Sequence, residues 1–280
     1  MEGRLGLVWV TGPDAVTFLD GILSQSVAAT GCGATARSLL LAPNGKMRAT
    51  LFLLRGEDRV GLVCDAGRVD TVIADLSRFK IRVDVAIELD RRPVYEVWGA
   101  TRAADGVPAI GSWTEEAGRL AFAMPLARHN LPRRVVVGPA PDTPLVDHSE
   151  IDVVRIEAGE PVMGVDLDDR TIPQEGVDVA DYVDFTKGCY LGQELVARID
   201  SRGHVNRRLV GLDIEGDQIP GHGIPVERDA REVGIVTSAS WSASRGRVIA
   251  LGMLRVEIEP EDQVTVEMRS AQVVALPMSW

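Results

Sequence analysis

Cysteine is scarce in this sequence, and the few cysteines follow no recognisable spacing. The 280 residues contain three, Cys32, Cys64 and Cys189, which are widely separated and odd in number. This argues against a disulfide framework and is typical of a reducing compartment. The four histidines show no paired ligand spacing, and three scattered thiolates cannot supply the four ligands of a typical iron-sulfur cluster. We therefore expect no stable metal site made from protein ligands alone.

Long hydrophobic runs are also missing. The longest apolar stretch near the start, Leu5 to Val10, is ended by a Thr-Gly-Pro-Asp turn. It is too short for the core of a signal peptide or for a membrane-spanning helix, so we expect a cytoplasmic protein. Hydrophobic residues still make up 45% of the chain, which is enough for folded domains without metals or disulfides.

Positive charge is limited, and lysine is especially rare. Only Lys46, Lys80 and Lys187 stand among the 30 basic residues, and the formal net charge is −11. A molecule with this charge repels the phosphates that dominate nucleic-acid affinity, so we expect no direct DNA binding. Because lysines are so few, Lys187 is of interest for standing two residues before Cys189.

The first ninety residues alternate between strand and helix patterns. Apolar periodicity predicts strands at Leu5 to Val10, Ser38 to Ala42, Lys46 to Leu54, Arg59 to Cys64 and Ile81 to Leu89. The Asn44-Gly45 pair between the second and third of these is a strong hairpin signal. Helical spacing begins at Pro13 and again at Val69. This order predicts an α+β fold in which helices cover one side of a mainly antiparallel sheet.

Short strands continue through the middle of the chain. They are predicted at Val94 to Trp98, Leu120 to Met124 and Arg133 to Val137, and we expect them to extend the same sheet. Ser149 is expected to cap a helix that stops at Gly159. The long loop that follows, residues 160–184, is rich in Asp, Gly and Pro, and long loops in compact domains are often functional.

After Arg198 the pattern changes to short strands without helices. The predicted strands are Leu209 to Ile214, Ile224 to Glu227, Glu232 to Ala239, Val248 to Val256, Gln263 to Met268 and Gln272 to Leu276. Strands at this spacing are typical of a small barrel or sandwich. We expect one domain at residues 1–204, with a subdomain division near 92–145 if it holds two parts, and a second at 205–280.

The most unusual segment is KGCYLGQELVAR, residues 187–198. Cys189 lies between Gly188 and Gly192, and glycines let a backbone approach a ligand closely. A short helix is expected from Gln193. A thiol near Lys187 and just ahead of a helix N-terminus has two reasons to lose its proton. Cys189 would then be a nucleophile or a soft ligand near neutral pH.

Isolated cysteines more often behave as small buried hydrophobes. Cys64 lies on an apolar strand, and Cys32 lies between glycines with no charged neighbour, so we assign that role to both. For Cys189, chemistry alone leaves both roles open.

The segment resembles the KGCYxGQE motif of the YgfZ family, whose members are related to the glycine cleavage T-protein. Upstream, Arg155 to Gly159 (RIEAG) and Ile172 to Gly176 (IPQEG) are similar to the part of T-proteins that forms the folate pocket. The resemblance covers nearly the whole chain, and Arg92 to Leu145 is its least distinctive part. It implies a T-protein-like folate-binding domain with mainly antiparallel sheets and packed helices, followed by a small C-terminal β-barrel.

The resemblance also implies that tetrahydrofolate or a derivative binds in a central channel. Glu175 matches the position where T-proteins place a carboxylate on the pterin, whose amino group and ring N–H suit a two-point hydrogen bond. A solvated loop glutamate is the alternative. Cys189 and Lys187 are the expected catalytic residues. The other expected folate contacts are Arg155, Gly188, Tyr190, Gly192, Gln193, Glu194 and Arg198.

One departure from the T-protein pattern bears on activity. T-proteins carry an aspartate pair after the hairpin glycine, one of which helps to activate the substrate amine, and the matching positions here are Arg48 and Ala49. Without that carboxylate, the group that would accept the proton of the substrate amine is missing, so we do not expect classical aminomethyl transfer.

The resemblance to the YgfZ branch implies a folate-dependent accessory protein for iron-sulfur cluster assembly or repair. Its expected partners are iron-sulfur enzymes or cluster-assembly proteins, with no membrane involved. Two alternatives stay open. One is a folate-dependent one-carbon transferase or demethylase, and the other is a regulator of iron-sulfur enzymes that modify tRNA.

Overall fold

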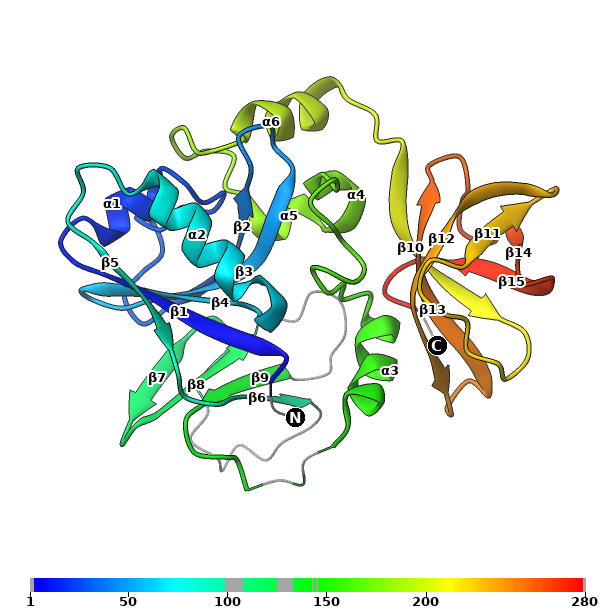
Figure 1. Cartoon of the computed structure of the whole chain (residues 1–280), viewed down its shortest axis with the longest axis horizontal. Coiled ribbons are helices and arrows are strands. Elements are labelled where there is room, and N and C mark those ends of the chain that lie inside the picture. Colours follow the sequence, from blue (N-terminus) through cyan, green and yellow to red (C-terminus); the bar gives the residue numbers. More distant parts are fainter. Residues whose placement is uncertain (1–2, 99–107, 125–132, 143, 145, 279–280) are drawn as a thin grey trace. The chain divides into compact units, whose positions relative to one another are not determined.

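The structure is a computed structural model that describes residues 3–98, 108–124, 133–142, 144 and 146–278. The described residues pack as two compact units (Figure 1). The first holds those within Met1–Leu126, Asn130–Leu145 and Asp178–Arg198, and the second holds those within Val146–Val177 and Ile199–Trp280. This division differs from the expected one at residues 204 and 205, because residues 146–177 pack with the barrel.

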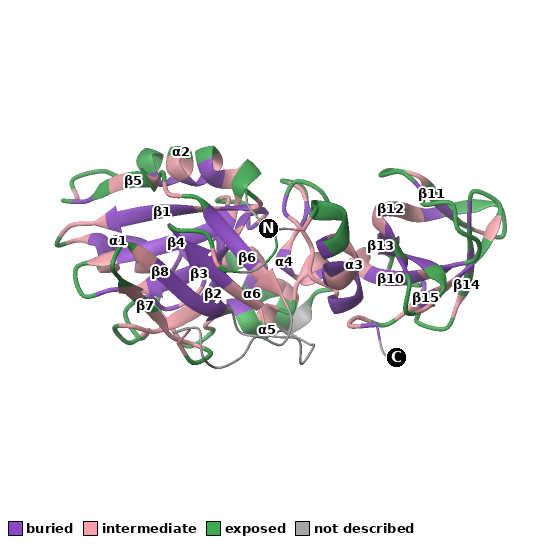
Figure 2. Cartoon of the chain, turned by 90° about the horizontal axis from the view of Figure 1, so that it is seen from below, coloured by how far each residue is buried: buried purple, intermediate pink, exposed green. Residues whose placement is uncertain are grey.

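An antiparallel five-stranded sheet forms the centre of the first unit. Its strands are β1 (Leu5–Thr11), β2 (Thr35–Leu41), β3 (Met47–Arg55), β4 (Arg59–Asp65) and β5 (Ala86–Asp90), in the order β2-β3-β4-β1-β5. Helices α1 (Ala15–Asp20) and α2 (Val69–Phe79) cover one face, with a 3₁₀ turn at Ala66–Arg68 before α2. Figure 2 shows the buried strands and the exposed outer side of α2. The predicted α+β fold is confirmed.

A second sheet covers the opposite face of the first. It contains β6 (Val94–Trp98), β7 (Trp113–Glu116), β8 (Arg119–Met124) and β9 (Arg133–Val137), in the order β6-β9-β8-β7. Leu7 and Phe52 of the first sheet pack in one apolar cluster with Phe122 and Val135 of the second. The expectation that these strands extend the first sheet is therefore wrong. The face that the helices leave uncovered is itself apolar, and a separate sheet buries it.

The alternating segment from Ile81 to Leu89 is a strand only in its second half. Arg82 has a φ of 57°, which regular strand geometry does not allow, and Ile81 is 71% exposed. Val83 and Val85 nevertheless pack into the core beneath the helices. The alternation at the start of this segment therefore reflects burial of a loop and not pairing within the sheet.

The predicted hairpin at Asn44-Gly45 joins β2 to β3. The amide of Gly45 donates to the carbonyl of Ala42, and the amide of Ala42 donates to the carbonyl of Lys46, both at 2.8 Å. Gly45 has a φ of 78°, a conformation that glycine adopts without strain. The tip of this hairpin matters for the site because the motif segment packs against it.

The second unit is built on a closed barrel. The strands are β10 (Arg207–Ile214), β11 (Pro225–Arg228), β12 (Arg231–Ser242), β13 (Arg247–Arg255), β14 (Gln263–Val266) and β15 (Arg269–Val274). Their order is β10-β13-β12-β11-β14-β15, and β15 pairs back onto β10. Apolar side chains such as Leu212, Val236 and Val266 fill its interior. The predicted C-terminal barrel is confirmed.

Helix α3 (His148–Ala158) and the loop after it are fixed to the barrel by a buried carboxylate. Gly159 ends the helix as predicted, with a φ of 69°. Asp166 accepts hydrogen bonds from the hydroxyls of Thr237 and Ser238, both at 2.6 Å. These two neighbours in β12 both reach Asp166 because the strand shifts register between Val236 and Ser238.

Three further helices lie near the candidate residues: α4 (Pro173–Gly176), α5 (Val179–Tyr182) and α6 (Gln193–Arg202). The helix predicted at Gln193 is therefore present. Within the part of the chain that the structure describes, no helix is long and apolar enough to cross a membrane.

Candidate functional site

The motif segment lies in the first unit, where a loop connects α5 to α6. Cys189 is exposed on this loop, as are Phe185 and Gly188. A solvent-accessible thiol at Cys189 is what a reactive role requires. The chemistry of that thiol stays a prediction.

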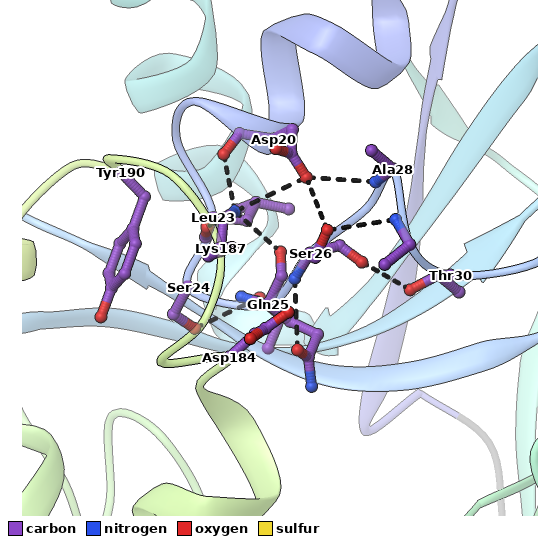
Figure 3. Close-up of polar contacts among 12 residues, drawn as sticks. Asp20, Leu23, Ser24, Gln25, Ser26, Ala28, Thr30, Asp184, Lys187 and Tyr190 are labelled. Carbon is purple, nitrogen blue, oxygen red and sulfur yellow. Dashed lines mark hydrogen bonds and ion pairs between the residues drawn. The ribbon is translucent and has the colours of Figure 1, made fainter.

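Lys187 points away from solvent and is held by backbone carbonyls. Its side chain is 2% exposed. The ammonium donates to the carbonyl oxygens of Asp20 at 2.6 Å, Leu23 at 2.8 Å and Gln25 at 3.1 Å (Figure 3). The Asp20 carboxylate lies 3.7 Å away. Burial lowers the pKa of Lys187 from its ordinary value, and the charge of Asp20 opposes that shift.

The start of the loop is tied to the same segment of chain. The hydroxyl of Ser24 donates to the carbonyl of Tyr182 at 2.8 Å, and the amide of Asp184 donates to the carbonyl of Ser24 at 3.1 Å. The Asp184 carboxylate accepts from the side chain and the amide of Thr186. Those two hydrogen bonds from Thr186 hold the pKa of Asp184 below its ordinary value.

The end of the loop packs against the β2–β3 hairpin through two glycines. Gly192 has a φ of 79°, and a Cβ at this position would lie 2.6 Å from the carbonyl oxygen of Ala42. A Cβ on Gly45 would lie 2.5 Å from the Cβ of Leu195. Gly192 is therefore required by packing within the protein. A Cβ on Gly188 would meet no atom within 4 Å, so packing does not require glycine there.

The remaining motif residues divide between structural and exposed positions. Tyr190 is 8% exposed, its ring centre lies 5.5 Å from the Lys187 ammonium, and burial raises the pKa of its hydroxyl to about 12. The side chain of Gln193 accepts from the amide of Tyr190 at 3.1 Å, at the start of α6. Glu194 and Arg198 are exposed on α6. Their expected contacts with folate stay predictions.

The other two cysteines differ from each other. Cys64 is buried in the core, and burial raises the pKa of its thiol to about 12. The inert role expected for Cys64 fits this position. Cys32 is exposed, so the prediction that it is buried is wrong. It lies in a turn where Gly33 has a φ of 79°, outside the regular strands that bury their neighbours.

Glu175 lies in the second unit, on the short helix α4. One carboxylate oxygen lies 3.2 Å from Nε of Arg207, and the other accepts from the amide of Ile172 at 3.2 Å. The side chain is 10% exposed. An ionised carboxylate has about four acceptor positions, so these two contacts leave capacity for a two-point hydrogen bond to a ligand.

Arg155 also lies in the second unit, where protein acceptors surround its guanidinium. It donates to Asp152 at 2.6 Å, Asp166 at 2.8 Å and Ser238 at 2.7 Å, and more weakly to the carbonyl of Glu160 at 3.4 Å. Most of its N–H donors are therefore engaged. This arrangement ties α3 to β12 and leaves little for the folate contact that the sequence suggested.

Sequence reasoning missed the residues that hold these side chains. Nothing in the local pattern joins Lys187 to the segment Asp20–Gln25, which lies more than 160 positions earlier. Arg207 is the first residue of β10, and nothing in its position in the sequence indicated an ion pair with Glu175. Among the described residues, no cluster of three or more His, Cys, Asp or Glu side chains is arranged to hold a metal ion.

Two packed antiparallel sheets with covering helices, followed by a six-stranded barrel, define an aminomethyltransferase-like fold. The crystal structure of the glycine cleavage system aminomethyltransferase T from Bartonella henselae matches with a TM-score of 0.84. The match covers 99% of this chain and 85% of that one, at 20% sequence identity.

Sequence comparison identifies the family. The family model of the glycine cleavage T-protein C-terminal barrel domain matches residues 207–279. An aminomethyltransferase of Rubrobacter xylanophilus is 30% identical over 98% of this chain and 81% of its own length. An aminomethyltransferase of Synechococcus elongatus is 37% identical over 44% of this chain and 33% of its own length. The chain belongs to the glycine cleavage T-protein family.

Proposed function

We propose that the protein is a tetrahydrofolate-binding accessory protein that supports the assembly or repair of iron-sulfur clusters in other enzymes, with Cys189 as the working thiol. The observation that carries this proposal is the exposure of Cys189 on a loop whose sequence, KGCYLGQE, resembles the YgfZ motif. A thiol on the surface can reach a cluster or a thiol of a partner protein, which a buried one cannot.

The residues present suit folate binding in part. The Glu175 carboxylate keeps acceptor positions for the amino group and ring N–H of a pterin, and its ion pair with Arg207 helps to hold it in place. Arg155 does not fit, because its donors are engaged within the protein. Tetrahydrofolate, when bound, would supply a carrier for one-carbon units.

The hairpin positions argue against the activity named for the relatives. Arg48 stands where T-proteins have an aspartate, and its Nε donates to Asp75 at 2.7 Å on helix α2. Ala49 at the next position is buried in the core. Neither residue can take a proton from a substrate amine, so an accessory role is favoured over aminomethyl transfer.

A folate-dependent one-carbon transferase or demethylase is the second candidate, and the aminomethyltransferase relatives favour it. Purified protein incubated with tetrahydrofolate and a methylated or aminomethylated substrate distinguishes the two. We expect no turnover. Multiple turnovers per protein molecule would make the transferase the better proposal.

The partners of an accessory protein would be iron-sulfur enzymes, including those that modify tRNA. The net charge of −11 favours contact with such proteins over contact with the tRNA itself.

The thiol is tested in cells that lack the protein. Variants are returned to these cells, and the activity of an iron-sulfur enzyme is measured. We expect no restoration by Cys189→Ser and full restoration by Cys32→Ser, which changes the other exposed cysteine. Full restoration by Cys189→Ser would end the proposed role of the thiol.

The folate contact is tested by titrating tetrahydrofolate into purified variants and following tryptophan fluorescence. Glu175→Gln keeps an oxygen for the amide of Ile172 but loses the charge and one acceptor. We expect it to weaken binding by about tenfold or more, the usual effect of losing a charged hydrogen bond. Glu215→Gln, an exposed position in the same unit, is the control and should bind like the original protein. Equal affinities in both variants would place the pterin contact elsewhere.

A further inference from the structure

The Cys189 loop is attached at both ends, and Lys187 anchors it between them. Ser24 ties its start to Tyr182 and Asp184, and Gly192 packs its end against Ala42. Between these points, residues 185, 186, 188 and 189 are exposed, and Lys187 turns inward as a buried cation.

The acceptors around Lys187 are groups that need a donor. Asp20 is the last residue of α1, and carbonyls at the end of a helix have no partner within the helix. Leu23 and Gln25 follow in the turn after it. An ammonium has three N–H donors, and the three carbonyl oxygens use all of them (Figure 3). Lys187 therefore supplies donors to the end of α1 and to the turn after it from a distant part of the chain.

The same geometry weakens the other role open to Lys187, that of a charge which activates the neighbouring thiol. The three carbonyls already occupy the N–H groups that would otherwise donate to a thiolate at Cys189. The Asp20 carboxylate at 3.7 Å also offsets the positive charge, so the field that the pair projects toward the loop surface is small.

We infer that Lys187 is a positioning residue, which holds Cys189 at a fixed place on the surface by clamping its loop to the segment Asp20–Gln25. This inference rests on the proposed function, in which Cys189 is the working thiol. A partner's cluster or thiol then meets a sulfur on a loop that is already ordered. Binding of the partner does not spend free energy on ordering that loop.

The first test compares Lys187→Met with Lys80→Met in a Cys32→Ser background, which removes the other exposed cysteine. Lys80 is exposed and serves as the matched control. Amide hydrogen exchange is measured for residues 185–190, together with the pH dependence of Cys189 alkylation by iodoacetamide.

We expect Lys187→Met to speed amide hydrogen exchange in residues 185–190 by about tenfold or more, because the buried hydrogen bonds that hold the loop are lost. The pH midpoint of alkylation should match that of Lys80→Met. Unchanged exchange, or a midpoint shifted upward by Lys187→Met, would overturn the inference in favour of an activating charge.

Asp20→Asn provides a second variant in case Lys187→Met does not fold. The new side-chain amide keeps an oxygen for the hydroxyl of Ser26 and the amide of Ala28, and the three carbonyls stay in place. A positioning lysine predicts an unchanged alkylation midpoint. An activating lysine would act more strongly without its counter-charge, so a lower midpoint in Asp20→Asn would overturn the inference.

Restoration of iron-sulfur enzyme activity in cells separates failure of this inference from failure of the proposed function. We expect Lys187→Met to lose activity as Cys189→Ser does, while Lys80→Met keeps it. If Cys189→Ser is fully active, the proposed function fails, yet exchange and alkylation still decide how Lys187 acts. If Cys189→Ser is inactive and Lys187→Met is fully active, the positioning role is wrong and the thiol role stands.

Discussion

At the scale of single residues, burial separates the three cysteines into two chemical kinds. Cys64 is 1% exposed within the core beneath α1 and α2, whereas Cys32 and Cys189 are exposed. Only a thiolate reacts readily as a nucleophile, and an apolar environment disfavours the charged form. The exposed pair can therefore take part in thiol chemistry that Cys64 cannot.

This difference predicts the alkylation pattern of the folded protein. Burial raises the pKa of Cys64 to about 12, so its thiolate fraction at pH 8 is on the order of one in ten thousand. Treatment with iodoacetamide at pH 8, followed by mass spectrometry of peptides, should label Cys32 and Cys189 and leave Cys64 unmodified. The same treatment in urea should label all three. Labelling of Cys64 in the folded protein at the rate of Cys32 would contradict its burial.

The sequence indicated some of these residue environments and not others. Cys64 could be placed in the core because its strand is apolar in sequence. Cys32 and Lys187 could not be placed, because their surroundings come from loops and from distant segments. A lysine two positions from a cysteine suggested a charge near a thiol, while its actual acceptors are carbonyls from Asp20 to Gln25.

At the scale of elements, the contact between the β2–β3 hairpin and the start of α6 depends on the absence of side chains. Gly192→Ala would place a Cβ 2.6 Å from the carbonyl of Ala42 and force alanine to a φ of 79°. We expect a loss of about 2 kcal/mol in the free energy of unfolding, measured with urea. Gly188→Ala, four positions earlier with open space around it, should change it by less than about 0.5 kcal/mol. Similar values for both variants would contradict this packing.

The attachment of α3 to the barrel gives another element-scale prediction. The side chains of Arg155 and Asp166 are 7% and 0% exposed, so Arg155→Met leaves a buried carboxylate without its countercharge. We expect the free energy of unfolding to fall by about 3 kcal/mol or more. Arg170→Met removes an ion pair to Asp168 from a side chain that is 80% exposed, and it should cost less than about 1 kcal/mol. Urea unfolding of the two variants side by side provides the measurement, and equal losses would refute the buried anchor.

Most element positions could be predicted from periodicity, but their pairing could not. The strands at Val94 to Trp98 and Arg133 to Val137 were expected in the first sheet and belong to the second. Alternation reports which residues of a strand are buried, and it does not say which strand lies beside it. The segment from Ile81 to Val85 alternates and yet is a loop, because Arg82 leaves the extended region.

At the scale of the whole molecule, charge limits the choice of partner. The chain has 41 acidic and 30 basic residues, so its formal net charge is −11. Several of the arginines are already paired with carboxylates, among them Arg59, Arg92 and Arg155. A molecule with this excess of negative charge is poorly suited to a phosphate backbone, so we expect a role near tRNA modification to act through the modifying enzyme.

The net charge also predicts how the protein behaves toward tRNA. Because affinity for nucleic acid comes mainly from neutralised phosphates and released counterions, an acidic molecule should not bind tRNA on its own. In a filter-binding or gel-shift assay with labelled tRNA, we expect no complex even at low salt, where attraction between opposite charges is least screened. A purified iron-sulfur enzyme that modifies tRNA is the positive control. Adding this protein should not lower that enzyme's affinity for tRNA, because this protein does not compete for the RNA. Formation of a complex by this protein alone, weakening steeply as salt is raised, would show a local basic surface strong enough to overcome the net charge. It would also favour a direct role on tRNA over contact with the enzyme.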